Sequence, residues 1–528
     1  MRIHIIPEPE SIRVSDRTVF TLTRLCEFLS QKGTEKASGE LTEFFSDKFG
    51  FELLGTGKET ISIAIDESLT ASESYTLDIT ENLIEIKGAD ESGVFYAAET
   101  LKQIFHQCGE NLPEIHITDK PAYSYRGFML DSGRYFFPVE DVKKFIDIMA
   151  LHKLNRFHWH LTEDQGWRAQ MLDNILLTEI GSCRSHTNFD NKPHGGYYTK
   201  EDMKEIVDYA HKKCIKVIPE IDTPGHVVSA IAAYPFLSCF DRNLNVATHC
   251  GVKHDVLCVG KESTFEFMFS VFDELLEVFT DGLIHIGGDE VPTTRWKICP
   301  HCQKRIKDEG LSCTEDLHPY YLSRIAEYIE SKGSKVIMWN DAVRDYMAKG
   351  SIVRQHWGAG MGEKDIVGQI NKGIEFIVSF AGAYYLDLPY GLISLKDCYN
   401  YNTYYDGISK ENTDKILGVE ACLWTEFVPH MKKAGYQMFP RLGAYSETAW
   451  TKKENKSYER FLEKLSFYEY LISLSGMNYA SEKQATPKGV KKLASKLYWE
   501  RRKLCWEGLH NLIDNASVER KYKGEENK

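Results

Sequence analysis

Short strand-like runs separated by turns dominate the first 120 residues. Examples are ISIAID (61–66), SYTLDI (74–79) and LIEIKG (83–88), in which apolar and polar positions alternate. Residues 92–105 follow a different pattern, with apolar residues at three- and four-residue steps, as on one face of a helix. We therefore predict a small α+β domain over residues 1–120.

From about residue 123, strand-like runs alternate with amphipathic helical patterns. The eight candidate strands are residues 127–133, 156–164, 216–222, 283–290, 335–341, 352–357, 376–382 and 417–424. The helical patterns include residues 139–152, 200–213, 263–280 and 317–332, and one more follows the last strand at 436–449. Eight such units predict an α/β fold, a closed (β/α)8 TIM barrel over residues 123–475. A doubly wound open sheet is the structural alternative.

A basic amphipathic pattern with Trp and Leu covers residues 486–513. We predict a C-terminal helical extension and tail over residues 480–528. We favour a helix packed on the barrel or on a partner subunit, as in a homo-oligomer, over a membrane-binding helix.

The composition limits the partners of the protein. The 528 residues carry a formal net charge of −13, whereas nucleic acids and anionic membranes attract basic surfaces. We therefore expect no nucleic acid and no membrane as the main partner. The N-terminus shows no signal-peptide core, and no apolar run approaches the ~18–20 residues of a membrane span. These features predict a cytoplasmic protein.

The cysteines suggest one further site. There are 13, an odd number, and in a reducing compartment they are most simply free thiols. The motif CPHC places Cys299 and Cys302 two residues apart, with Cys313 further on, a spacing compatible with a structural zinc. We favour the alternative of reduced thiols in a surface loop, because no second CxxC follows at zinc-finger spacing.

Acidic and aromatic residues gather at the predicted carboxyl ends of the strands, which share one mouth in a barrel. These ends present Asp131, Arg134, His158, His160, Glu163, Asp164, Trp167, Glu220, Asp222, His226, Asp289, Glu290, Trp339, Asn340, Asp341, Trp357, Tyr384, Tyr385, Asp387, Trp424 and Glu426. Sugar rings stack their C–H faces on aromatic side chains, and their hydroxyls pair with carboxylates. We therefore favour a sugar pocket over simple packing of the barrel mouth.

Other chemistries have less support. His158 and His160 lie two apart on one strand and face the same side, so a metal site is an alternative. We favour it less, because the tryptophans would have no role in it. The G-x-S-x-G motif of a serine nucleophile is missing from the sequence. The segment HIGGDE (285–290) instead places two adjacent acids after a Gly-Gly step, which suggests a close backbone approach and two acids with different roles.

Taken together, these segments resemble glycoside hydrolase family 20, the β-N-acetylhexosaminidases. The resemblance rests on YRGFMLDSGRYFFPVEDVKKFIDIMALHKLNRFHWHLTEDQGWR (125–168), PEIDTPGH (219–226), HIGGDEVP (285–292), YYLD (384–387) and EACLWTE (420–426). It implies a retaining exo-enzyme that removes terminal non-reducing β-linked GlcNAc, and possibly GalNAc, from glycans. In this family the 2-acetamido oxygen of the substrate attacks the anomeric carbon, so that an oxazolinium ion forms.

The resemblance also implies roles for single residues. Glu290 would be the general acid and base, with a pKa raised by burial and by Asp289, which would orient the acetamido group. Tyr385 would donate to the acetamido oxygen, and an Asp164–His226 pair would support Glu290. The expected sugar-binding residues are Arg126, Trp339, Trp357, Asp387, Trp424 and Glu426. Glu163 replaces an Asp found in many relatives, and we expect no consequence.

The resemblance implies no cofactor and no active-site metal. The implied partner is a glycan or oligosaccharide with a terminal N-acetylhexosamine. One alternative is a family relative that releases a disaccharide or takes a phosphorylated amino sugar. Another, of a different class, is a non-catalytic carbohydrate-binding protein.

Overall fold

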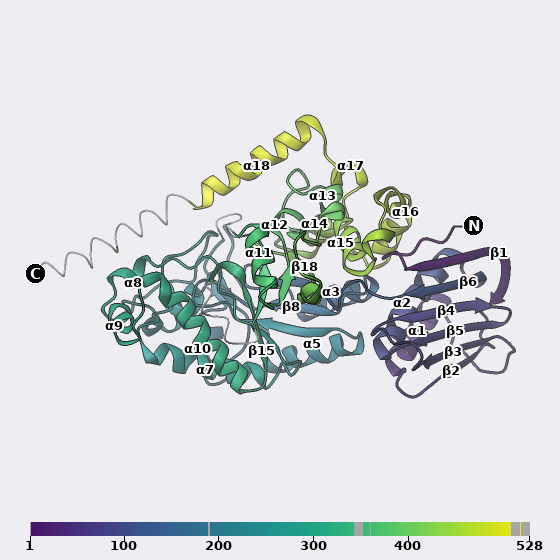
Figure 1. Ribbon diagram of the computed structural model, residues 1–528, viewed down its shortest axis with the longest axis horizontal. Helices are drawn as coiled ribbons and strands as arrows, with labels where there is room; N and C mark the ends of the chain where they lie inside the picture. Colours follow the sequence, from purple (N-terminus) through teal and green to yellow (C-terminus); the bar gives the residue numbers. More distant parts are fainter. Residues whose placement is uncertain (1, 188–190, 343–351, 359–360, 508–517, 519–528) are drawn as a thin grey trace, which may run out of the picture.

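The computed structural model describes residues 2–187, 191–342, 352–358, 361–507 and 518. A small α+β domain precedes a barrel, and a helical region follows it (Figure 1). The predicted fold class is confirmed.

The N-terminal domain is a six-stranded mixed sheet with the order β1-β6-β4-β5-β3-β2. Its strands are β1 (Ser11–Thr21), β2 (Glu27–Ser30), β3 (Thr60–Ile65), β4 (Tyr75–Thr80), β5 (Leu83–Gly88) and β6 (Asn111–Asp119). Helices α1 (Glu35–Phe49) and α2 (Glu91–Cys108) pack against each other, and α2 also contacts four strands of the sheet and the barrel helix α3. This position explains why α2 is buried over most of its surface.

Eight parallel strands close the barrel in the order β13-β14-β15-β16-β17-β18-β7-β8. They are β7 (Tyr125–Asp131), β8 (Arg156–His160), β13 (Lys216–Glu220), β14 (Leu283–His285), β15 (Lys335–Trp339), β16 (Val353–His356), β17 (Phe376–Val378) and β18 (Ile416–Leu423). Nearly all their residues are buried, as expected for parallel strands covered by helices outside and by side chains within. Each strand begins within two residues of the start of one of the eight runs predicted from the sequence.

Helices follow the strands and form the outer layer. They are α3 (Val139–Leu151), α4 (Leu176–Glu179), α5 (Lys200–Lys212), α6 (Val228–Ala233), α7 (Glu262–Leu276), α8 (Thr294–Ile298), α9 (Pro300–Asp308), α10 (Leu317–Ser331), α11 (Glu363–Ile370), α12 (Ala381–Tyr384), α13 (Leu395–Asn400), α14 (Met431–Met438) and α15 (Arg441–Trp450). Two short hairpins also follow β8, formed by β9 (Thr162–Glu163) with β10 (Gly166–Trp167) and by β11 (Cys183–Arg184) with β12 (His194–Gly195).

Two predicted elements differ from the structure. The run 283–290 is a strand only as far as His285, because the backbone then turns through positive φ angles at Gly287, Gly288 and Glu290. The helix predicted at 436–449 is divided between α14 and α15. Pro440 stands at the break, where its ring and missing N–H do not allow an uninterrupted helix.

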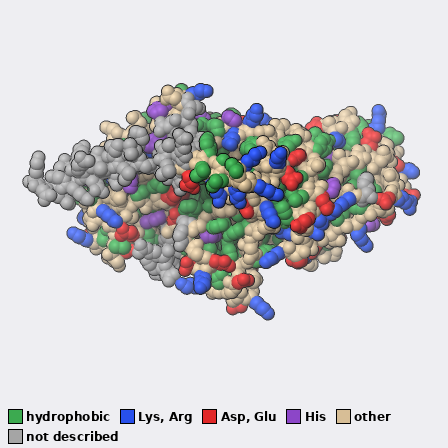
Figure 2. Space-filling view, turned by 90° about the horizontal axis from the view of Figure 1, so that it is seen from above, with side chains coloured by type: hydrophobic (Ala, Val, Ile, Leu, Met, Phe, Trp, Pro, Cys, Tyr) green, Lys and Arg blue, Asp and Glu red, His purple; other side chains and the backbone are tan. Residues whose placement is uncertain are grey.

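The C-terminal region consists of α16 (Tyr458–Leu474), α17 (Glu482–Ala485) and α18 (Gly489–Glu507). The ring of Trp499 in α18 lies 5.0 Å from that of Phe427, just after β18, so α18 contacts the barrel. Figure 2 looks down on the side where α18 lies in Figure 1, and hydrophobic side chains there are mixed with lysines and arginines. Val490, Leu493, Leu497 and Tyr498 of α18 are exposed. The homo-oligomer stays a prediction, and residues 508–513 of the predicted helix lie outside the described residues.

Within the described part of the chain, the helices are too short or too polar to cross a lipid bilayer.

Candidate active site

A cavity of about 220 Å³ opens at the carboxyl ends of the barrel strands. Nine of the predicted site residues line it: Asp164, His226, Asp289, Glu290, Trp357, Tyr385, Asp387, Trp424 and Glu426. They come from segments after six different barrel strands, and the barrel brings them together because these strand ends share one mouth.

The Gly-Gly step of HIGGDE fits tightly against a neighbouring carboxylate. A Cβ atom on Gly287 would lie 1.8 Å from Oδ1 of Asp222, and the N–H of Gly288 donates to the same oxygen at 3.1 Å. Both glycines have positive φ angles, +70° and +100°, which favour glycine. The sequence needs both glycines so that the chain can pass Asp222 and turn Asp289 and Glu290 into the cavity.

His226 stands between the two acids. Its Nε2 lies 3.7 Å from Oδ2 of Asp289 and 3.8 Å from Oε2 of Glu290. Burial opposes a positive charge on this ring, but the negative charge of Glu163 outweighs it and raises the pKa of His226 well above its ordinary value. At neutral pH the two acids therefore share an imidazolium neighbour.

His226 faces two carboxylates, and the predicted partner, Asp164, is the more distant of the two. Nδ1 of His226 contacts Oε2 of Glu163 at 3.0 Å, whereas Oδ2 of Asp164 is 3.8 Å away. Asp164 lines the cavity, but its Oδ1 accepts the backbone N–H of Val228 at 3.0 Å. Glu163 therefore makes the shorter of the two carboxylate contacts with His226.

The two adjacent acids differ in their surroundings. Burial raises the pKa of Asp289 to about 7, with further increases from the negative charges of Asp341 and Glu290 and a decrease from His226. The side chain of Glu290, in contrast, is 43% exposed. The burial that we expected for Glu290 is therefore wrong.

Asp341 connects Glu290 with the aromatic wall. Its Oδ2 accepts the backbone N–H of Glu290 at 3.0 Å, and its Oδ1 accepts Nε1–H of Trp357 at 2.5 Å. One carboxylate therefore fixes both the backbone that carries Glu290 and the plane of the Trp357 ring.

The aromatic wall consists of Trp357, Tyr385 and Trp424. The rings of Trp357 and Tyr385 are parallel within 9°, with centroids 6.4 Å apart, and Trp424 lies 5.9 Å from Tyr385 at an angle of 60°. Trp339 is not among the residues that line the cavity. It is buried, 5.7 Å from Trp424, and donates Nε1–H to Glu220 at 2.8 Å. Trp339 thus supports the wall from within the barrel instead of forming its surface.

Polar atoms at the cavity remain available to a ligand. Oδ1 of Asp289, Nε2 of His226, Oδ1 of Asp387 and Nε1 of Trp424 are buried and have no hydrogen-bond partner among the described residues. Buried polar groups are normally paired, so these atoms indicate a polar ligand. Burial and the charge of Glu426 raise the pKa of Asp387 well above its ordinary value, as expected for a buried carboxyl group beside a second negative charge.

The prediction for Arg126 is wrong. This residue lies near the start of β7, at the opposite end of the barrel from the cavity. Its buried guanidinium donates to Glu73 of the N-terminal domain at 2.6 Å and to the carbonyls of Tyr123 and Lys153 at 2.8 Å. Arg126 therefore connects the two domains.

The arginine at the cavity is Arg134, just beyond the carboxyl end of the same strand. Its guanidinium contacts Oε1 of Glu163 at 2.6 Å and Oε1 of Glu426 at 3.8 Å, and it lies over the ring of Trp424. Arg134, Glu426 and Asp387 together form the charged side of the cavity.

We expect substitutions of the two arginines to affect different properties, stability for Arg126 and activity for Arg134. Arg126→Gln removes a buried guanidinium and its ion pair with the partly buried Glu73. It should lower the free energy of unfolding by about 3 kcal/mol, with KM unchanged. Arg134→Gln removes a charged group from the cavity and should lower kcat/KM roughly 10–100-fold. Thermal unfolding and steady-state kinetics on both variants test this. A raised KM for Arg126→Gln with an unchanged Tm would restore the original assignment.

The barrel interior contains a network of buried charges. Both ring nitrogens of His158 contact carboxylates at 2.8 Å, Nε2 with Glu220 and Nδ1 with Glu420. Burial opposes protonation, but these two charges raise the pKa of His158 to about 9. His160 contacts Glu220 and Glu163 in the same way. The histidines considered as metal ligands are therefore already paired, which favours an ion-pair network over a metal site.

Several residues at the site were not selected from the sequence. Glu163, Arg134, Asp222 and Asp341 were visible at strand ends, but no signal in the sequence distinguished them from their neighbours. Phe427 and Trp499 also line the cavity. Trp499 belongs to α18, far along the chain, and only the fold reveals its place.

Comparisons with known proteins agree with this geometry. The family model "Glycosyl hydrolase family 20, catalytic domain" matches residues 123–453, and "Glycosyl hydrolase family 20, domain 2" matches residues 2–120. A "Beta-hexosaminidase" of Porphyromonas gingivalis is 35% identical over 511 residues, which cover 90% of this chain and 64% of that protein. The chain thus spans less than two thirds of the length of this relative.

Two further proteins are matched over a larger share of their own length. A "Beta-hexosaminidase" of Akkermansia muciniphila is 32% identical over 448 residues, which cover 82% of this chain and 90% of that protein. The crystal structure of an exo-β-N-acetylglucosaminidase from Vibrio harveyi with N-acetylglucosamine superposes with a TM-score of 0.82 at 27% identity, and covers 91% of this chain and 79% of that one. The chain belongs to glycosyl hydrolase family 20, as its sequence indicated.

Proposed function

We propose that this protein is a retaining exo-β-N-acetylhexosaminidase that removes a terminal non-reducing β-linked GlcNAc from a glycan. The observation that carries the proposal is the pair of adjacent acids in one cavity, Asp289 with its raised pKa and Glu290 in a more solvated place, with His226 within 3.8 Å of both. Two carboxyl groups in different environments are suited to different roles.

The first step requires an acid and an oriented acetamido group. Glu290 protonates the glycosidic oxygen while the acetamido oxygen attacks the anomeric carbon, and the bond to the leaving group breaks. Asp289 accepts the acetamido N–H, and Tyr385 donates its hydroxyl hydrogen to the acetamido oxygen. The product of this step is a bicyclic oxazolinium ion, whose positive charge the Asp289 carboxylate stabilises.

The second step reverses the role of Glu290. Its carboxylate takes a proton from water, the water oxygen attacks the anomeric carbon on the face that the leaving group vacated, and the acetamido group is restored. Two inversions at one carbon give net retention. Protons and charges balance without a cofactor, and the parallel rings of Trp357 and Tyr385 provide an apolar place for the acetamido methyl group.

The cavity supports a single sugar residue. Its volume of about 220 Å³ is smaller than the roughly 300–1,000 Å³ of pockets that enclose drug-sized ligands. This size favours release of one monosaccharide over release of a disaccharide. Asp387, Arg134 and Glu426 line the cavity and would provide hydrogen-bond partners for the hydroxyl groups of the ring. Activity on GalNAc, the cytoplasmic location and the oligomeric state stay predictions.

The test of this function is hydrolysis of p-nitrophenyl β-N-acetylglucosaminide with and without a thiazoline analogue of the oxazolinium ion. We expect release of p-nitrophenol, inhibition by the thiazoline, and no turnover of the corresponding β-glucoside, which lacks the attacking acetamido oxygen. Turnover of both sugars at similar rates would contradict the substrate-assisted step. Tight binding of GlcNAc without turnover would favour a carbohydrate-binding protein instead.

The dependence on pH follows from Asp289. kcat/KM reports groups of the free enzyme, and Asp289 must be ionised to stabilise a positive charge. With a pKa of about 7, Asp289 gains a proton below neutral pH, so kcat/KM should fall towards acid, tenfold per pH unit. His226 lowers this pKa, so His226→Gln should move the acidic limb to higher pH. An acidic limb unchanged in His226→Gln would contradict this assignment.

A further inference from the structure

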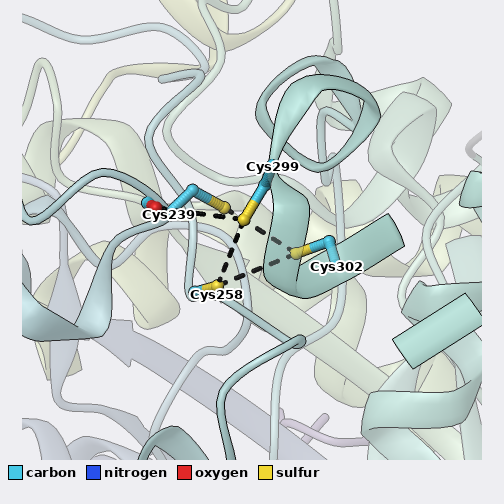
Figure 3. A group of neighbouring side chains, drawn as sticks. All are labelled: Cys239, Cys258, Cys299 and Cys302. Carbon is cyan, nitrogen blue, oxygen red and sulfur yellow. Dashed lines mark hydrogen bonds between the residues drawn. The ribbon is translucent and has the colours of Figure 1, made fainter. Parts of the chain in front are cut away.

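Four buried cysteines converge outside the active-site cavity. Cys239 and Cys258 lie at the two ends of a loop that follows β13, and Cys299 and Cys302 lie in the segment after β14. Figure 3 shows their four sulfur atoms turned towards one another. The group differs from the sequence expectation in two ways. Both cysteines of CPHC are buried at the start of α9 instead of lying in a surface loop, and Cys313 is not part of the group.

The distances between the sulfurs suit one tetrahedral ion. Sγ of Cys258 lies 3.7 Å from those of Cys299 and Cys302, and Sγ of Cys239 lies 3.9 Å from that of Cys302. Four thiolates at the usual Zn–S distance of about 2.3 Å would be separated by ~3.8 Å, the edge of a tetrahedron. A disulfide needs about 2.05 Å, and all four cysteines are free.

The chemistry of the group also favours a metal over ordinary packing. A buried free cysteine commonly behaves as a small apolar side chain, but packing does not require four sulfurs to face one point. Cys299 is the N-cap of α9 and Cys302 lies in its first turn, where the helix dipole stabilises negative charge. Four soft thiolates in tetrahedral array select zinc among the common divalent ions.

The two segments that the cysteines join contact each other elsewhere too. Nε1–H of Trp296 donates to the carbonyl of Leu257 at 2.9 Å, and Nδ1 of His254 lies 2.9 Å from Oγ1 of Thr294. A Cβ on Gly260 would lie 2.1 Å from the carbonyl carbon of His301, so only glycine permits this approach. The cysteine group thus lies at an interface between two loops that also contact each other through other residues.

We propose that Cys239, Cys258, Cys299 and Cys302 bind one structural Zn²⁺ that joins the two active-site loops following β13 and β14. Binding displaces the thiol protons to solvent and involves no redox step. The first loop carries Cys250, Gly251 and Val252, which line the cavity, and the second segment begins with Asp289 and Glu290. The zinc would hold the loop after β13 and the segment after β14 in a fixed position relative to each other. This positioning role depends on the proposed function, whereas the metal site does not.

The experiment measures metal in the full chain, purified without chelator or added zinc. We expect one equivalent of zinc per chain, released when a mercurial reagent blocks the thiols. Cys239→Ser and Cys302→Ser should lose this equivalent. Cys313→Ser is the matched control, because Cys313 lies 11 residues from Cys302 but outside the group, and it should retain the zinc.

A second measurement uses the unaltered protein, in case the serine variants fail to fold. After exchange of zinc for Co²⁺, a four-thiolate site should show strong thiolate-to-cobalt charge-transfer bands and the visible bands of tetrahedral cobalt. Alkylation followed by mass spectrometry should find the four cysteines protected until the metal is removed.

Three outcomes would overturn the proposal: protein that contains no zinc and shows no thiolate bands with cobalt, a disulfide within the group, or full zinc occupancy in Cys302→Ser. Stoichiometric zinc in a protein without hydrolase activity would leave the metal site in place and contradict the proposed function instead. The two proposals can therefore fail separately.

Discussion

Glu290→Gln should lower kcat on p-nitrophenyl β-N-acetylglucosaminide roughly 10²–10⁴-fold, the range that general acid–base catalysis contributes. Glutamine matches the shape of glutamate but cannot donate a proton to the leaving oxygen or take one from water. The side chain is 43% exposed and the contact with Asp341 is through the backbone N–H. The substitution should therefore leave Tm unchanged, so that the loss reports chemistry and not folding.

The leaving group provides a second test of the acid role. A dinitrophenyl leaving group departs with little protonation, so bond cleavage in Glu290→Gln should suffer much less with this substrate. Glu315→Gln is the matched control, because the side chain of Glu315 is also 43% exposed and lies in the same segment after β14, paired with Lys297 outside the cavity. Equal losses with both leaving groups would refute the acid role, and near-normal turnover of Glu290→Gln would refute the assignment altogether.

Asp289→Asn should have the second largest effect, a decrease in kcat of about 10²–10³-fold, as for the loss of one preorganised electrostatic group. Asparagine can still accept the acetamido N–H, but it carries no charge to stabilise the oxazolinium ion. The interaction strengthens as positive charge develops, so affinity for the thiazoline should fall in parallel while affinity for the product GlcNAc changes less. Inhibition constants for both ligands measure this difference.

Asp387→Asn is the contrasting variant for Asp289→Asn. Asp387 faces the same cavity with an unpartnered oxygen among the described residues, but we place it at ring hydroxyls whose charge does not change during the reaction. This substitution should raise KM more than it lowers kcat. A variant Asp289→Asn that only raises KM would show that Asp289 binds the sugar without stabilising the intermediate.

Periodicity and local motifs predicted much of this protein. The barrel strands were found because parallel strands buried on both faces read as short apolar runs, a signal contained within each segment. The two adjacent acids at the cavity were found because strand ends with acids and tryptophans are local features that a barrel places at one mouth. The segment HIGGDE could be explained in part from the sequence, because a Gly-Gly step indicates that the backbone passes close to another group.

The contacts between side chains of different segments could not be predicted from any single segment. Arg126 lies at the start of β7 and Arg134 just beyond its end, but β7 has seven residues and is ~23 Å long, so only one arginine reaches the cavity. Glu163 and Asp164 are adjacent, and both carboxylates face Nδ1 of His226, at 3.0 Å and 3.8 Å.

The sequence by itself therefore determined the fold class, the family and the pair of acids, because these depend on patterns within short segments. Only the tertiary structure decided that Arg134 and not Arg126 lines the cavity, and that Glu163 makes the shorter contact with His226. It also decided that Trp499 borders the cavity and that Cys239 and Cys258 meet CPHC. Some of these contacts join residues that lie from about 40 to more than 200 positions apart in the chain. Others depend on which of two nearby residues faces the partner. Packing in three dimensions determines both kinds of contact.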